Sequence, residues 1–140
     1  MQMCYSIIMK TIYLVLLAFL AIGICTAEVP NLVGNWAGSE DAYFAENGSY
    51  KLFENFSVSF AIVEQNGRLF TGNITYMEYG KEMAEGFAGA IGLDNKTLYM
   101  AESGEGYDFG TIISDDEIEL TYVEDGENGK ATIDKYHRIK

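Results

Sequence analysis

The sequence predicts an all-β domain, an eight-stranded antiparallel up-and-down β-barrel, and three observations carry this prediction. From residue 56 onward apolar and polar residues alternate, which is the period of a half-buried strand. Short runs of Gly, Asn and Asp interrupt the alternation at regular intervals, as hairpin turns do. No segment after residue 27 has a helical period, and the only proline, Pro30, precedes the first expected strand. A two-sheet β-sandwich is the alternative.

Residues 1–27 are expected to be a secretory signal peptide. From Met9 the chain reads MKTIYLVLLAFLAIGICTA, which is one lysine, an apolar run and small residues before the cleavage point after Ala27. Met9 is therefore the expected start of translation. Cleavage would export residues 28–140 as one domain, secreted or held in the cell envelope. An uncleaved anchor over residues 11–25 is the alternative, although the apolar run is short for a membrane span.

The first strand is expected at residues 32–38, and a long connection over residues 39–55 follows it. This connection contains the aromatic residues Tyr43, Phe44 and Tyr50. Loops of this length are uncommon in compact domains and are usually functional or partly structured. We therefore expect a lid over one end of the barrel.

The next two strands form a hairpin around Asn66-Gly67, because this pair supplies the positive φ angles of a tight turn. Five further short strands follow, and closing the sheet removes both of its edges. Three inward glycines, Gly72, Gly89 and Gly110, either leave room inside or allow the sheet to coil. The residues expected to face inward are Phe56, Val58, Phe60, Ile62, Phe70, Ile74, Tyr76, Phe87, Ile91, Leu98, Met100, Tyr107, Phe109, Ile113, Ile118, Leu120, Tyr122, Ala131 and Ile133.

Composition argues against several functions. The net charge of −12 repels nucleic acid and anionic lipid. Both cysteines lie in the expected signal peptide, and His137 is the only histidine, so no metal site with nitrogen or sulfur ligands and no nucleophile–base pair is expected. The acidic turns at residues 115–119 and 124–128 are interpreted as solvated hairpin tips and not as calcium loops. We expect no enzyme activity and no cofactor.

Four N-x-S/T triplets stand in the expected mature chain, where chance would give about one. They make N-glycosylation of an exported protein a further expectation. The acceptor asparagines are Asn47, Asn55, Asn73 and Asn95.

The single tryptophan, in the triplet Gly34-Asn35-Trp36 on the first expected strand, resembles the signature of the calycin superfamily, which includes lipocalins, avidins and fatty-acid-binding proteins. The resemblance implies that Trp36 plugs the closed end of the barrel. It also implies that a basic side chain of the last strand, here Arg138, lies across the indole ring. The disulfides of secreted lipocalins and the additional tryptophans with which avidins hold biotin are absent, so biotin binding is not implied.

Alternate connections of an up-and-down barrel fall at opposite ends, and both long connections fall at the same end. The side chains expected to wall this mouth are Tyr43, Phe44, Tyr50, Tyr76 and Tyr79. Its expected rim is acidic, with Glu82, Glu105 and Glu124. An aromatic throat with a negative rim suits a small, partly apolar, neutral or cationic ligand. The alternative is a structural or adhesive cell-envelope module that binds no small ligand. The oligomeric state is left open.

Overall fold

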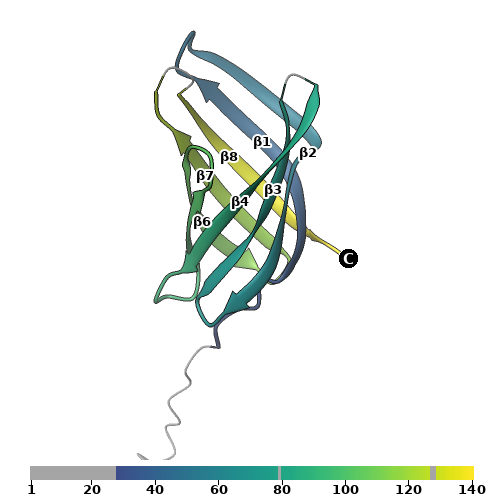
Figure 1. The fold of residues 1–140 in the computed structure, drawn as a ribbon, viewed down its shortest axis with the longest axis vertical. Coiled ribbons are helices and arrows are strands. Elements are labelled where there is room, and N and C mark those ends of the chain that lie inside the picture. The colour runs from purple at the N-terminus through teal and green to yellow at the C-terminus, as the bar shows by residue number, and fades with distance from the viewer. Residues whose placement is uncertain (1–27, 79, 127–128) are drawn as a thin grey trace, which may run out of the picture.

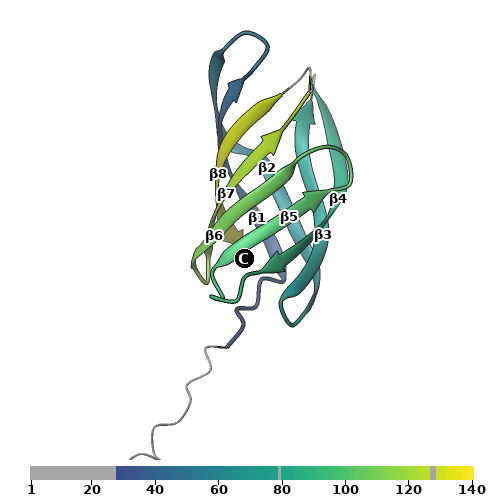
Figure 2. The ribbon, with the colours of Figure 1, turned by 90° about the vertical axis from the view of Figure 1, so that its left-hand side faces the viewer.

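The computed structural model describes residues 28–78, 80–126 and 129–140, so the expected signal peptide lies outside the described part. Eight antiparallel strands close into a barrel in sequence order, which confirms the predicted fold class (Figures 1 and 2). Within the described residues, no helix has the length and apolar character needed to cross a membrane. The strands are β1 (Gly34–Phe44), β2 (Ser49–Asn66), β3 (Leu69–Glu78), β4 (Lys81–Ile91), β5 (Thr97–Glu102), β6 (Tyr107–Ser114), β7 (Glu117–Glu124) and β8 (Lys130–Ile139).

Pairing of the first strand with the last closes the barrel. β1 lies antiparallel to β8 along its length, with Trp36 opposite Arg138 and Phe44 opposite Lys130. On its other edge β1 pairs with β2. Each strand therefore has two neighbours in the described structure. Two segments toward the hairpin end keep one unpaired edge, because β2 before Val58 pairs with β1 alone and β4 before Phe87 pairs with β3 alone.

The connection expected as a loop over residues 39–55 is instead a long hairpin, which corrects that prediction. β1 continues to Phe44 and β2 begins at Ser49. The hairpin projects beyond the other strands at one end (Figure 2). Its alternation is hard to see in the sequence because the inward positions on β1 are Glu40, which is half-buried, and Ala42, which is buried. Neither is the large apolar residue by which an inward position is usually recognised.

Aromatic residues fill the end of the barrel opposite this hairpin, called here the closed end. The Trp36 ring stacks on Phe60 with 5.9 Å between centroids, and Phe60 meets Tyr136 edge-on at 4.6 Å. The inward glycines make room for rings: a Cβ on Gly89 would lie 2.3 Å from the Phe70 ring. The buried core residues are Leu32, Trp36, Val58, Phe60, Ile62, Phe70, Ile74, Phe87, Ile91, Leu98, Met100, Ile112, Ile118, Leu120 and Tyr136.

The inward-facing residues predicted for β6 are wrong. Tyr107, Phe109 and Ile113 are exposed on the outer face, and the strand buries Asp108 and Ile112 instead. Register explains the difference, because Asp108 lies opposite Tyr122 of β7 and Ile112 opposite Ile118, and both partners face inward. Phe109 finds its contact outside, edge-on to Tyr99 at 6.5 Å between centroids.

The inward-facing residues predicted for β8 are also wrong. Ala131 and Ile133 face outward, and the buried residues are Thr132, Asp134 and Tyr136. Arg138 lies opposite the inward-facing Trp36, so it belongs to the inner face of β8. Side chains two residues apart on a strand share a face, so the inner face also carries Tyr136, Asp134 and Thr132. Two strands thus present carboxyl groups to the barrel interior where apolar side chains were expected.

Candidate functional site

Arg138 and Trp36 seal the closed end together. The guanidinium carbon lies 4.2 Å from the centroid of the indole ring. Its Nη1 donates to the carbonyl of Val33 at 2.8 Å and its Nη2 to that of Asn31 at 2.9 Å. The indole Nε1 donates to the carbonyl of Leu32 at 3.1 Å. This cation–π contact, combined with a fork of hydrogen bonds, ties the segment before β1 to the last strand.

Gly34 is required at this position for two reasons. Its φ is +145°, which L side chains rarely adopt. A Cβ there would also lie 2.9 Å from Nη1 of Arg138. The residues of the Gly34, Trp36 and Arg138 signature are therefore brought together at the closed end.

The aromatic residues expected to wall the mouth are separated by the structure. Tyr43 and Tyr50 face each other across the β1–β2 hairpin with 5.2 Å between ring centroids, and both are exposed on its outer side. Phe44 is half-buried beneath the Lys51 ammonium, which lies 4.9 Å from its ring centroid. Tyr76 packs against the core from β3. Tyr79 lies outside the described residues.

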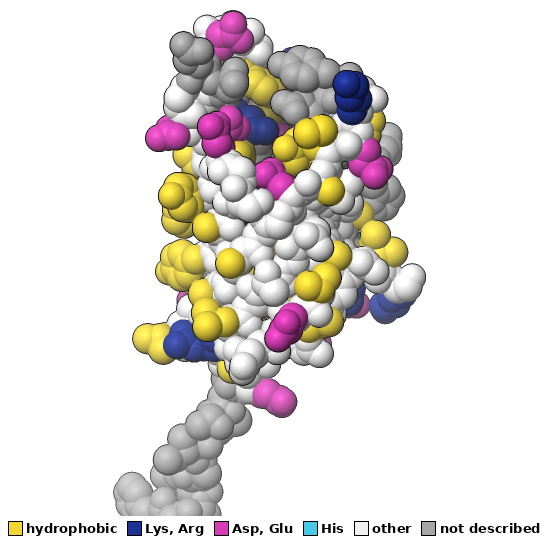
Figure 3. All heavy atoms as spheres, viewed as in Figure 1, with side chains coloured by type: hydrophobic (Ala, Val, Ile, Leu, Met, Phe, Trp, Pro, Cys, Tyr) yellow, Lys and Arg dark blue, Asp and Glu magenta, His cyan; other side chains and the backbone are white. Residues whose placement is uncertain are grey.

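A recess of about 530 Å³ lies at the mouth, between the tip of the β1–β2 hairpin and the β7–β8 turn. It includes Tyr43, Phe44 and Glu124 of the predicted mouth, together with Lys130. Lys130 and Glu124 form an ion pair at 3.9 Å. On the face shown in Figure 3, charged side chains gather around this end and again at the opposite end, while the wall between them carries few. Of the other predicted rim residues, Glu82 and Glu105 are exposed.

Below this recess four carboxyl groups face the interior, and we call them the interior acidic cluster: Glu40 of β1, Glu102 of β5, Asp108 of β6 and Asp134 of β8. Asp108 is 2% exposed and Asp134 is 5% exposed. Glu40 lies opposite Asp134 in the β1–β8 pairing. Lys130 is the cation whose charge acts on all four groups.

Burial raises the pKa of every carboxyl group in the interior acidic cluster. The pKa of Asp134 rises to about 8, first through burial and then through the charge of Glu40. Burial raises the pKa of Glu102 and of Asp108 as well, and the charge of Asp108 raises that of Glu102 further. Lys130 opposes these shifts but does not reverse them. At neutral pH the cluster therefore retains protons that exposed carboxylates would have lost.

Among the described residues, four buried polar atoms in the same region have no hydrogen-bond partner of full geometry, although Thr132 lies close enough to Asp134 to lower the pKa of that carboxyl group. They are Oδ2 of Asp108, Oγ1 of Thr132, Oδ1 of Asp134 and the hydroxyl oxygen of Tyr136. Buried polar groups are nearly always paired, and an unpaired one costs about 1 to 3 kcal/mol. A concentration of unpaired oxygens inside one barrel end is therefore a mark of a binding site.

The interior acidic cluster was missed by the sequence prediction, although one signal for it was present. Arg138 is assigned to the inner face by the calycin resemblance, and period two then places Tyr136, Asp134 and Thr132 on the same face. The predicted inward residues Ala131 and Ile133 have the opposite parity. For Asp108 the sequence carries no such signal, because the aromatic residues on either side of it favour the wrong phase.

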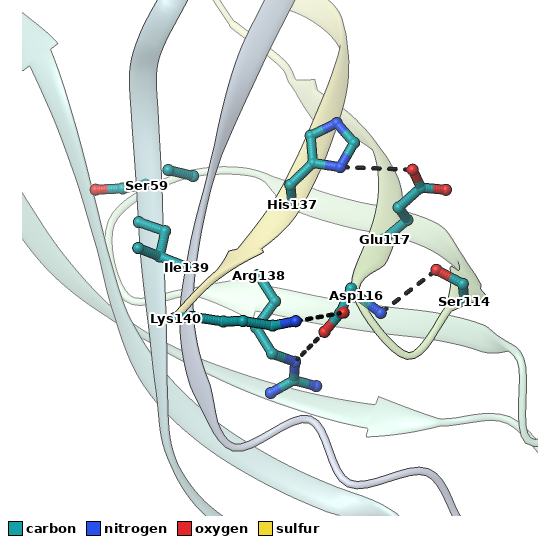
Figure 4. A pocket seen from close by; sticks show the side chains of 9 residues that line it. Ser59, Ser114, Asp116, Glu117, His137, Arg138, Ile139 and Lys140 are labelled. Carbon is teal, nitrogen blue, oxygen red and sulfur yellow. Dashed lines mark hydrogen bonds and ion pairs between the residues drawn. The ribbon is translucent and has the colours of Figure 1, made fainter.

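A second recess, of about 1050 Å³, lies on the outer wall where β7, β8 and the chain terminus meet (Figure 4). Two polar pairs line it: Nδ1 of His137 lies 3.5 Å from Glu117, and Nζ of Lys140 forms an ion pair with Asp116 at 3.6 Å. These side chains are 49% to 85% exposed, so solvent weakens the interactions between them. Among the described residues no group of three or more His, Cys, Asp or Glu side chains could hold a metal ion.

The expected glycosylation sites occupy different positions. Asn47 is exposed in the β1–β2 turn, where its side-chain oxygen accepts the Ser49 N–H at 2.8 Å. Asn73 is exposed on the outer face of β3. Asn95 lies in the β4–β5 turn with a φ of +56°. The Asn55 side chain lies outside the described part of the structure.

Comparison with known proteins gives the fold alone. No model of a known protein family matches the chain, and no curated protein sequence matches it. Among solved structures the chain is similar to a redesigned β-barrel, with a TM-score of 0.54 and 11% sequence identity. The match covers 78% of this chain and 92% of that one. At this identity the similarity supports an eight-stranded barrel and carries no function.

Proposed function

We propose that this protein is an exported barrel of the calycin type that binds a small, partly apolar, neutral or cationic molecule at its mouth. The observation that carries the proposal is the set of four unpaired buried oxygens below the mouth recess. An interior that is apolar at the closed end and lined with unsatisfied polar groups at the mouth matches the usual design of a ligand site, in which a few polar groups orient the ligand.

The calycin assignment is supported by geometry at the closed end. Trp36 is fully buried, Arg138 lies across its ring, and the strands that carry them are paired. These are the relations that the resemblance implies.

An envelope module without a small ligand is the second candidate, and the outer face favours it. Tyr99, Tyr107 and Phe109 are exposed together on β5 and β6. Exposed apolar groups of this kind often serve contacts with other macromolecules. In this candidate the unpaired interior oxygens have no role, which is why we rank it second.

Native mass spectrometry of protein purified from the exported fraction tests the proposal. We expect a chain that begins at Glu28 and carries a small molecule, which is released when the protein is denatured. An exported chain that retains no small molecule, and gains none from a library of neutral and cationic compounds, would favour the envelope module. A chain that retains residues 11–25 would identify an anchored protein.

A further inference from the structure

The ligand class can be narrowed from the interior acidic cluster, and this step rests on the proposed function. We propose that the barrel binds a slender organic ammonium ion, a primary amine on an unbranched apolar chain. The ammonium group is held by Asp108 and Asp134, and the apolar chain extends toward the mouth recess.

The charge balance of the interior favours a cation. The cluster has four carboxyl groups, and Lys130 is the cation that acts on them. Lys130 is already engaged at the rim, where its Nζ lies 3.9 Å from Glu124 and 5.0 Å from the centroid of the Tyr122 ring. An anion brought into this region would meet carboxyl groups on several sides, whereas a cation would be stabilised by them.

The hydrogen-bonding capacity of the site favours an ammonium with N–H groups. The unpaired atoms are two carboxyl oxygens, of Asp108 and Asp134, and two hydroxyl oxygens, of Thr132 and Tyr136. All four can accept a hydrogen bond, and a primary ammonium donates three. A quaternary ammonium donates none and would leave these oxygens unpaired.

The depth of the site favours a slender ligand. Inward residues on one strand follow each other at intervals of about 7 Å. Starting from Lys130 at the rim, Thr132 therefore lies about 7 Å and Asp134 about 13 Å below the mouth along β8. An unbranched apolar chain attached to the ammonium group would run from the buried oxygens toward the mouth recess, where Phe44 supplies an aromatic wall.

Binding of such a ligand would release a proton. The ligand arrives as an ammonium ion, and a carboxyl group of the cluster that holds a proton gives it to solvent and becomes the carboxylate partner. The ammonium keeps its own protons, so one proton leaves for each carboxyl group that ionises. The charged and titratable groups that face Asp108 and Asp134 are Glu40, Glu102, Tyr122, Lys130 and Tyr136, with Glu85 acting on Glu102.

Isothermal titration calorimetry at pH 7 with matched probes tests the inference. The probes are hexylammonium, hexanol, hexanoate, hexyltrimethylammonium and calcium ion, each titrated in two buffers of different ionisation enthalpy. We expect hexylammonium to bind at least tenfold more tightly than hexanol or hexyltrimethylammonium, with release of a proton to the buffer. Hexanoate and calcium should not bind.

The double variant Asp108→Asn and Asp134→Asn should weaken hexylammonium binding at least tenfold. Circular dichroism and Trp36 fluorescence, which reports on the distant closed end, would show that the barrel is folded. Glu119→Gln is the matched control, since it removes one carboxyl group from the exposed outer face of β7 and should leave binding unchanged.

The outcomes separate this inference from the proposed function. If hexanol binds as tightly as hexylammonium and the double variant binds both normally, the ammonium site is wrong while a ligand-binding barrel stands. Calcium binding that the double variant abolishes would replace the ammonium by a metal ion. If no probe binds although native mass spectrometry finds a retained molecule, the ligand class is wrong. If neither method finds a ligand, both proposals fail.

Discussion

Asp134→Asn should change how the stability of the barrel depends on pH. Asp134 is buried, and its pKa rises from 3.8 to about 8 in the folded protein. Between these values the folded state holds a proton that the unfolded state has lost. The contribution of Asp134 to the free energy of unfolding is therefore greatest below about pH 4, falls as the pH rises from about 4 to about 8, and levels off above that, where the folded protein also ionises.

The size of the effect follows from the shift. One pKa unit corresponds to about 1.4 kcal/mol, so a shift of about four units amounts to roughly 5 kcal/mol. Small domains are stable by about 5 to 15 kcal/mol, so this loss is a large part of the total. Asparagine occupies nearly the same volume and does not ionise. The variant should match the natural protein near pH 4 and exceed it by several kcal/mol at pH 9.

Urea unfolding followed by Trp36 fluorescence measures this difference, because the chain has one tryptophan and it is fully buried. Curves should be recorded from pH 4 to pH 9 for the natural protein, Asp134→Asn and the exposed control Glu119→Gln. The control should follow the natural protein at every pH. Parallel pH curves for the natural protein and Asp134→Asn would show that Asp134 does not hold a proton inside the barrel.

Three further predictions concern the closed end and the core, and urea unfolding followed by circular dichroism measures each of them. Trp36→Ala should lower the free energy of unfolding by about 3 to 5 kcal/mol, because it truncates a large core side chain. An unchanged urea midpoint would contradict the role of Trp36 as the plug of the closed end. Arg138→Lys keeps the charge but loses the fork to Val33 and Asn31, so a loss of about 2 to 3 kcal/mol is expected; a neutral result would mean that charge alone suffices. Gly89→Ala should cost about 1 to 3 kcal/mol because its Cβ would meet the Phe70 ring. Gly86→Ala, with no atom nearer than 3.8 Å, should be tolerated.

The sequence was sufficient for the strands whose inward positions carry large apolar side chains. On β7 the alternation of Ile118, Leu120 and Tyr122 identifies the inner face, and all three are buried. The same holds for Leu98 and Met100 on β5. Here burial and hydrophobicity agree, so a pattern of period two contains the needed information.

The sequence was insufficient for the strands on which the buried face is not the more hydrophobic face. β6 buries Asp108 and exposes Phe109, so the more hydrophobic face is the outer one. On β8 the buried Asp134 stands beside the exposed Ile133 in the same way. Local alternation cannot choose between the two phases, because a strand's register is fixed by its neighbours through hydrogen bonds. The candidate site lay in these strands, which is why the aromatic mouth was predicted and the interior acidic cluster was not.

The two halves of the barrel contribute oppositely to stability, and this division favours a function at the mouth. The closed end is packed with aromatic rings and sealed by Arg138, whereas the mouth half buries carboxyl groups and unpaired oxygens that lower stability. Replacing Asp134 or Asp108 by an apolar residue would remove that penalty without disturbing the strand pairing. A sequence that keeps both groups departs from the rule of an apolar core only at one end, and such local departures concentrate at functional sites. The closed end therefore supplies the stability that allows the mouth half to bury carboxyl groups.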